Sequence, residues 1–201
     1  MFNIKHFARQ ALLALTLALG SVTAMATPYY HVNVNTAGLS GTGLMDFTFL
    51  GLGGAPGATA TLSNFSGAFG AEALREGAVS GAIPGIVGMS NTDAFNALTQ
   101  MVTLGGMFSF DVNFSGDFMA AAGDGTTLAV SLYNDDFTKY LGVEGAFAQF
   151  DLTPGAAGAA LVGVSGPNAL ADVAVVPEPS ELLLLLTGLG LMGVIVRRRT
   201  R

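Results

Sequence analysis

The chain has 201 residues, of which 28 are glycine and none is cysteine or tryptophan, and its formal net charge at pH 7 is −6. The absence of cysteine excludes disulfide bonds, a thiolate nucleophile and cysteine-ligated metals, so an exported form of this protein would depend on its core alone for stability. Abundant glycine, threonine and phenylalanine with little lysine or glutamate disfavour a helical bundle.

Residues 1–26 have the pattern of a Sec-type signal peptide. Basic residues precede a short apolar segment at 11–19, and Ala24 and Ala26 fit the small-x-small rule for cleavage. The apolar segment is too short to span a membrane. We therefore expect signal peptidase to cleave after Ala26 and to leave Thr27 as the mature N-terminus.

The body that follows shows repeated alternation of apolar and polar residues, which is typical of strands with one buried face. Glycine-rich turns and loops separate these segments. The strands that the pattern predicts are 29–35, 44–50, 59–65, 78–83, 108–114, 128–133, 146–152 and 171–175.

One segment, 91–102, departs from this alternation. Thr92 or Asp93 is suited to cap a short helix, and Phe95, Leu98 and Met101 recur at a spacing of three. The sequence therefore predicts an all-β fold, an antiparallel β-sandwich with one short helix. Periodicity alone leaves jelly-roll and immunoglobulin-like topologies open.

The body offers little that resembles a catalytic centre. Its one histidine, His31, falls on the polar face of a predicted strand, and no G-x-S-x-G motif accompanies it. We interpret His31 as a surface residue. The carboxylate pairs a glycosidase would need are Asp111 with Asp117 or Asp135 with Asp136, but no spacing rule identifies either pair. We expect no enzyme activity.

Calcium is the other chemistry that these carboxylates suggest. Asp135 and Asp136 follow an asparagine in one turn, and Asp124 precedes a glycine in another. Extracellular modules bind Ca²⁺ through such oxygen ligands, but neither segment has the spacing of an EF-hand. Asp and Asn are favoured in turns anyway, so these three are weak candidates and we expect no cofactor. Tyr29, Tyr30, Tyr133 and Tyr140 are the tyrosines that could stack on sugars or pack at sheet edges.

The C-terminal end carries a second targeting pattern. An uncharged apolar segment at 182–196 would be about 22 Å long as a helix, shorter than the ~30 Å hydrocarbon core of a bilayer. Arg197, Arg198 and Arg199 follow it, and such clusters stay on the cytoplasmic side. The body would then lie outside the inner membrane.

Directly before this segment, two prolines flank a glutamate and hold the chain extended. Pro-Glu-Pro, a leucine- and glycine-rich segment and a terminal arginine cluster, in that order over 176–201, resemble the PEP-CTERM sorting signal of Gram-negative bacteria. The resemblance implies recognition by an exosortase, a membrane-embedded cysteine transpeptidase or protease that cleaves near the motif. The motif residues are Val176, Pro177, Glu178, Pro179 and Ser180. A plain single-pass anchor is the alternative.

Residues 27–175 remain as one domain-sized body. It holds twelve acidic residues and two basic ones, Arg75 and Lys139, so its formal charge is about −10. This balance excludes nucleic acid and anionic membranes as partners, because both require clusters of lysine and arginine. The segments 32–36, 38–42, 46–49 and 109–112 also resemble a recurring class of PEP-CTERM cargo, which implies a secreted β-sandwich without an assigned activity.

The sequence thus predicts an exported protein that passes through the inner membrane and reaches the cell surface or the exopolysaccharide matrix of a biofilm. Signal peptidase and an exosortase would be its processing enzymes, exopolysaccharide would be its candidate partner, and its role would be structural or based on interaction. A glycan- or Ca²⁺-binding extracellular module is the alternative, and an extracellular hydrolase is less favoured.

Overall fold

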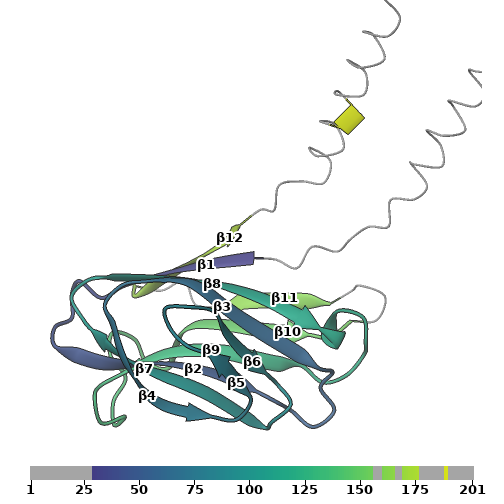
Figure 1. Cartoon of the computed structure of the whole chain (residues 1–201), viewed down its shortest axis with the longest axis horizontal. Helices are drawn as coiled ribbons and strands as arrows, with labels where there is room; N and C mark the ends of the chain where they lie inside the picture. The colour runs from purple at the N-terminus through teal and green to yellow at the C-terminus, as the bar shows by residue number, and fades with distance from the viewer. Residues whose placement is uncertain (1–28, 156–159, 166–168, 177–187, 190–201) are drawn as a thin grey trace, which may run out of the picture.

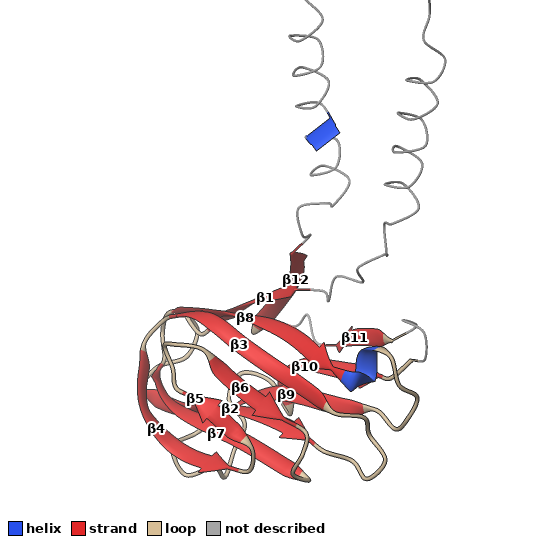
Figure 2. Ribbon diagram, turned by 45° about the vertical axis from the view of Figure 1, so that its right-hand side comes forward, coloured by secondary structure: helices blue, strands red, loops and turns tan. Residues whose placement is uncertain are grey.

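The computed structural model describes residues 29–155, 160–165, 169–176 and 188–189. The body is all-β, as the sequence predicts: two antiparallel sheets of six strands lie face to face (Figures 1 and 2). In order across sheet A, the strands are β12 (Ala171–Val176), β1 (Tyr29–Asn35), β8 (Met107–Gly116), β3 (Ala58–Ser66), β6 (Val87–Ser90) and β5 (Val79–Gly81). Sheet B consists of β11 (Leu161–Ser165), β10 (Ala146–Thr153), β9 (Thr126–Tyr133), β2 (Thr42–Leu50), β7 (Phe95–Thr103) and β4 (Phe69–Glu76).

Phenylalanine side chains from both sheets fill the space between them. In β8, Phe108, Phe110 and Phe114 point inward and are almost fully buried, because every second residue of a strand faces the same side. Edge-to-face contacts join the sheets: the rings of Phe47 and Phe110 lie 5.3 Å apart, and other pairs extend the cluster. The period-two pattern in the sequence is therefore the inward face of the sandwich.

The predicted helix over 91–102 is wrong, because these residues form most of β7. β7 lies between β2 and β4, and its inward residues alternate as Asn96, Leu98, Gln100 and Val102. Asn96 and Gln100 are buried amides, so the inward face does not appear apolar in the sequence. In the described part of the body, the only helix is a short 3₁₀ turn at Asp117–Met119, and the two described residues further on, Gly188 and Leu189, are also helical.

Three further strands, β4, β6 and β11, carry no clear signal in the sequence. β4 pairs with β7 through two shifts of register, and most of its residues are exposed. Such bulges disrupt the alternation. Within the first shift the Gln100 side chain donates to the Gly70 carbonyl, and beyond the end of β4 the Asn96 side chain accepts from the Ala78 N–H. The predicted strand at 78–83 is shorter than expected, as β5 spans Val79–Gly81.

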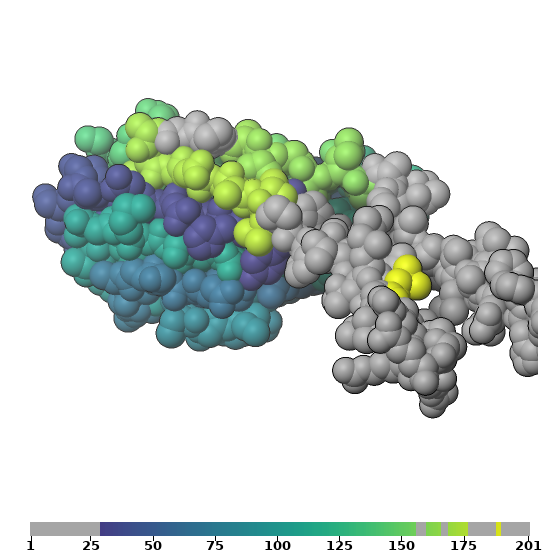
Figure 3. All heavy atoms as spheres, turned by 90° about the horizontal axis from the view of Figure 1, so that it is seen from above, coloured from purple at the N-terminus to yellow at the C-terminus, as the bar shows by residue number. Residues whose placement is uncertain are grey.

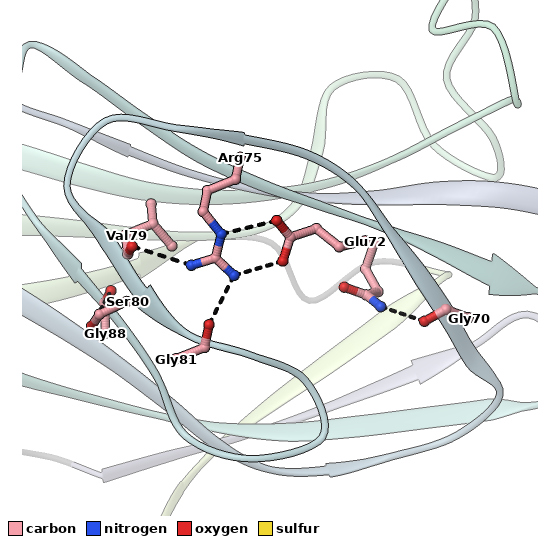
Figure 4. A network of polar contacts seen from close by, with 8 residues as sticks. Gly70, Glu72, Arg75, Val79, Ser80, Gly81 and Gly88 are labelled. Atoms are coloured by element: carbon pink, nitrogen blue, oxygen red, sulfur yellow. Dashed lines mark hydrogen bonds and ion pairs between the residues drawn. The ribbon is translucent and has the colours of Figure 1, made fainter.

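A side chain closes one edge of the sandwich. Arg75 of β4 pairs with Glu72 through two bonds of 2.9 and 2.6 Å, and also donates to the carbonyls of Val79 (3.1 Å) and Gly81 (2.8 Å) in β5 (Figure 4). Because Ser90 donates to Ala78, these two carbonyls point away from β6. Arg75 thus joins the edges of the two sheets and covers acceptors that an edge strand would otherwise expose.

The two ends of the described body lie side by side. Tyr29, the first residue of β1, is directly opposite Val176, the last residue of β12. Figure 1 shows both strands meeting at one corner, and Figure 3 shows the yellow-green residues of β12 lying along the purple residues of β1. Segments that continue from these two residues therefore leave the sandwich at the same place.

Candidate functional site

Most of the predicted processing residues lie outside the described part of the chain. These are Ala24, Ala26, Thr27, Pro177, Glu178, Pro179, Ser180 and the cluster Arg197, Arg198 and Arg199. Val176 is described and ends β12, where it is exposed. Among the described residues, none belongs to a helix that is long and apolar enough to cross a membrane, and the predicted apolar helix at 182–196 falls almost entirely on residues that are not described.

The structure separates the three calcium candidates. Asp124 precedes β9 and lies beside Gly54, whereas Asp135 and Asp136 follow the far end of that strand. Eight strand residues span roughly 25 Å, so Asp124 cannot share an ion with the other two. Asp135 accepts a bond from Thr42 (2.6 Å), and Asp136 accepts from the Thr138 hydroxyl (2.6 Å). In the described part of the chain, no group of three acidic or histidine side chains is arranged to hold a metal.

The carboxylates that a glycosidase would require are also far apart or differently engaged. Asp111 lies in the middle of β8 and Asp117 lies beyond its end, about 20 Å away along the strand direction. Asp135 and Asp136 are both exposed on one turn. Hydrogen bonds from the hydroxyl and backbone N–H of Thr138 lower the pKa of Asp136, the opposite of what a general acid needs.

His31 lies on the outward face of β1, as predicted, but it belongs to a polar cluster. Its Nδ1 is 2.5 Å from Oδ1 of Asp111, the residue directly opposite on β8. Oδ2 of Asp111 accepts bonds from Tyr29 Oη (2.8 Å) and Asn64 Nδ2 (2.6 Å). Three neighbouring strands therefore converge on one carboxylate, which is buried although it lies on the outer face of sheet A.

A bulge in β3 makes this convergence possible. The register between β3 and β8 shifts between Ser63 and Ser66, and Asn64 within this shift has a left-handed φ of 54°. Asparagine tolerates this region better than most residues. The bulge turns the Asn64 side chain back over β8, where its amide reaches Asp111. Sequence periodicity shows neither the bulge nor the contact.

This cluster ties strands together and has the electrostatics of a structural site. Burial raises the pKa of Asp111, but the hydrogen bonds from Asn64, His31 and Tyr29 outweigh it, so the pKa of this carboxyl is lower than its ordinary value. Within the described residues, no serine or threonine hydroxyl is hydrogen-bonded to His31. The histidine and carboxylate of a triad are present, but the nucleophile that would make them hydrolytic is not in contact.

The connection between β9 and β10 forms a second candidate site, which we call the aromatic loop and define as residues 133–144. Tyr133 contacts two other rings of the loop: its centroid lies 4.5 Å from that of Tyr140 and 5.3 Å from that of Phe137. The hydroxyls of Tyr133 and Tyr140 are 3.0 Å apart. Burial, together with Tyr140 and Asp46, raises the pKa of Tyr133 to about 12. Phe137 is 43% exposed.

A hollow of about 490 Å³ lies beside the last of these rings, that of Tyr140. It is lined by Thr138, Lys139, Tyr140, Gly142, Val143 and Glu144. A smaller hollow of about 250 Å³ shares Gly142 and continues toward Leu39 and Leu170. The lining thus brings one aromatic ring, one ammonium, one carboxylate and the hydroxyls of Thr138 and Tyr140 to an open surface, a mixture of apolar and polar groups that ligand sites also have.

Sequence reasoning identified Tyr133 and Tyr140 as candidates but missed Phe137. The available signal was the turn Asn134-Asp135-Asp136, whose residues favour tight turns and so indicate that the next residue is held at the tip. Comparison of this chain with protein-family models, with curated proteins and with solved structures finds no significant match.

Proposed function

We propose that this protein is exported, sorted by an exosortase through its C-terminal Pro-Glu-Pro motif, and delivered to the cell surface or exopolysaccharide matrix. There it has a structural or interaction role and no catalytic one. The sequence patterns at the two ends, 1–26 and 176–201, carry the sorting part of this proposal.

The positions of the first and last strands along the chain support the proposal. β1 begins at Tyr29, two residues after the expected signal-peptidase site, and β12 ends at Val176, directly before the Pro-Glu-Pro motif. Cleavage at both sites would therefore leave every described strand intact. Because Tyr29 and Val176 are paired neighbours, a body held in the membrane at one corner would keep its whole sandwich free of the bilayer.

The strand pairing favours the jelly-roll alternative within the predicted sandwich. β1 pairs with β8, β2 with β7, and β3 with β6. In each of these pairs, a strand from the start of the series β1 to β8 lies beside the corresponding strand counted back from its end. Jelly rolls have this pairing. β9 to β12 would then be additions that widen both sheets on the side where the chain leaves.

The intact mass of the protein in the membrane and extracellular fractions of the native host tests this function. The proposal expects an extracellular species that begins at Thr27 and ends near Pro177–Ser180. It also expects that Glu178→Ala, which alters only the motif, leaves the protein in the membrane fraction with Arg201 as its last residue.

The matched control is Glu181→Ala, which removes a carboxylate just outside the motif and should be processed like the wild type. A wild-type membrane species that still ends at Arg201, with none released, would make the tail a plain anchor. The sorting proposal would then be wrong.

A further inference from the structure

We propose that the aromatic loop binds a neutral polysaccharide, with one pyranose ring stacked on Phe137 and the chain continuing along the adjoining hollow. This inference rests on the interaction role proposed above and gives it a site and a ligand class. It assigns a use to the ring of Phe137, which the fold leaves partly exposed.

Phe137 has the features of a ligand contact, because its backbone conformation costs free energy and yet a large part of its ring stays exposed. Its φ is 60°, in the left-handed region that bulky residues rarely adopt. Such conformations persist where surrounding structure enforces them and are concentrated at functional sites. One side of its ring packs against Tyr133, 5.3 Å away, but the side chain is still 43% exposed, so part of the ring faces solvent at a strained backbone position.

Hydrogen bonds within the loop hold this geometry before any ligand arrives. Oδ1 of Asn134 accepts from the backbone N–H groups of Thr138 and Lys139, both at 3.0 Å. The Asn134 N–H donates to the Lys139 carbonyl (2.9 Å), and the Phe137 N–H donates to the Asn134 carbonyl (3.1 Å). Thr42 of β2 binds Asp135 and ties the turn to sheet B. A loop fixed in this way loses little entropy on binding.

The neighbouring groups match the two faces of a sugar. The C–H face of a pyranose is apolar and packs on an aromatic ring, while its hydroxyls need donors and acceptors. Thr138, Lys139 and Glu144 provide these around the hollow, and Tyr140 provides the aromatic ring of its lining. Because a second hollow continues from Gly142, the surface is elongated and suits a chain better than a single small molecule.

The acidic charge of the protein favours a neutral polysaccharide over an anionic one. The body carries twelve acidic residues against two basic ones, and the loop itself holds Asp135, Asp136 and Glu144 beside its single lysine. This field repels polyanions such as uronate-rich polysaccharides and nucleic acids. Uncharged hydroxyl-rich polymers meet no such repulsion.

Affinity electrophoresis of the full chain, solubilised in mild detergent, tests the site. Gels would contain dextran, galactomannan, soluble xylan or, as the polyanion, alginate. We expect retardation by at least one neutral polymer and none by alginate. Phe137→Asn removes the ring and places at φ 60° a residue that tolerates this region, so we expect affinity to fall by about 10- to 100-fold with no loss of thermal stability.

Phe95→Asn is the matched control, because Phe95 is 44% exposed and pairs with Leu50, at the end of β2 opposite Thr42. It should bind like the wild type. Retardation by alginate alone, by no polymer at all, or equally for Phe137→Asn and the wild type would overturn the inference. Each of these results is independent of where the host cleaves the tail, so failure here is distinct from failure of the sorting proposal.

Discussion

The carboxylate of Asp111 should be worth more to stability than any other on the outer faces of the sheets. It accepts bonds from Tyr29, His31 and Asn64, which come from two strands on either side of β8. A hydrogen bond to a charged group contributes about 1.5–3 kcal/mol, but water can replace part of this because all three donors are partly or fully exposed. We therefore expect Asp111→Ala to lower the free energy of unfolding by about 2–4 kcal/mol.

Denaturant unfolding at neutral pH measures this change, and thermal unfolding should show a fall in Tm of about 5–12 °C for a body of this size. Asp151→Ala is the matched control. The Asp151 carboxylate accepts bonds from Thr127 and Gln149 on the outer face of sheet B, but Asp151 is only half-buried. We therefore expect its loss to lower the free energy of unfolding by about 1 kcal/mol or less. Equal effects of Asp111→Ala and Asp151→Ala would show that the cluster does not stabilise the fold as argued.

The pH dependence gives a second test of the same residue. The pKa of Asp111 is lower in the folded protein than its ordinary value, so its stabilisation is present above an ordinary pKa of about 3.9 and is lost as pH falls through the lower, folded value. The difference in unfolding free energy between wild type and Asp111→Ala should therefore narrow below about pH 4. A difference that stays constant into strong acid would refute this explanation.

Three other expectations concern separate parts of the molecule. Asn96→Ala should cost about 3 kcal/mol in urea unfolding, because it leaves buried backbone groups around β7 without partners; a loss below about 1 kcal/mol would contradict this role. Arg75→Met should change the free energy of unfolding by no more than about 1 kcal/mol. It should nevertheless increase self-association, measured by light scattering, because the Val79 and Gly81 carbonyls at the edge strand β5 would lose their donor. A variant as monodisperse as the wild type would argue against edge protection. Alkaline titration followed by phenolate absorbance should show a step near the pKa of about 12 of Tyr133, and Tyr133→Phe should lack this step. Because folding raises this pKa, the neutral Tyr133 hydroxyl stabilises the fold below the ordinary tyrosine pKa, and this contribution is lost as pH rises through the pKa of the folded state.

Period-two alternation predicted the strands whose inward residues are apolar. In β1 and β8, Val32, Val34, Phe108 and Phe110 alternate with polar residues, so the sequence alone specifies which face is buried. The same reasoning failed at β7, because Asn96 and Gln100 occupy inward positions, and at β4, because bulges break the alternation. Both failures arise from one contact region, where buried amides of β7 bind the irregular backbone of β4 and its turn.

Of the candidate sites, the sequence supplied residue types but not their grouping. Asp111 and His31 were each identified, yet their contact depends on β1 pairing with β8 across a separation of 80 residues, and the approach of Asn64 depends on a bulge. In the aromatic loop, Tyr133 and Tyr140 are close in sequence, and their contact could have been inferred from the turn. The same turn indicates that Phe137 lies at the tip of the loop, but how far its ring is exposed depends on how the loop packs against β2.

The sequence by itself determined the class of the fold, the acidity of the body and the two terminal patterns on which the sorting proposal rests, because these depend on composition and on residues within a few positions of one another. Only the tertiary structure decided what lies together over long separations: the pairing of Tyr29 with Val176, the edge closed by Arg75 and the buried carboxylate of Asp111. In a sandwich most contacts join residues far apart in the chain. Their identity is fixed by strand order and register, which local pattern does not encode.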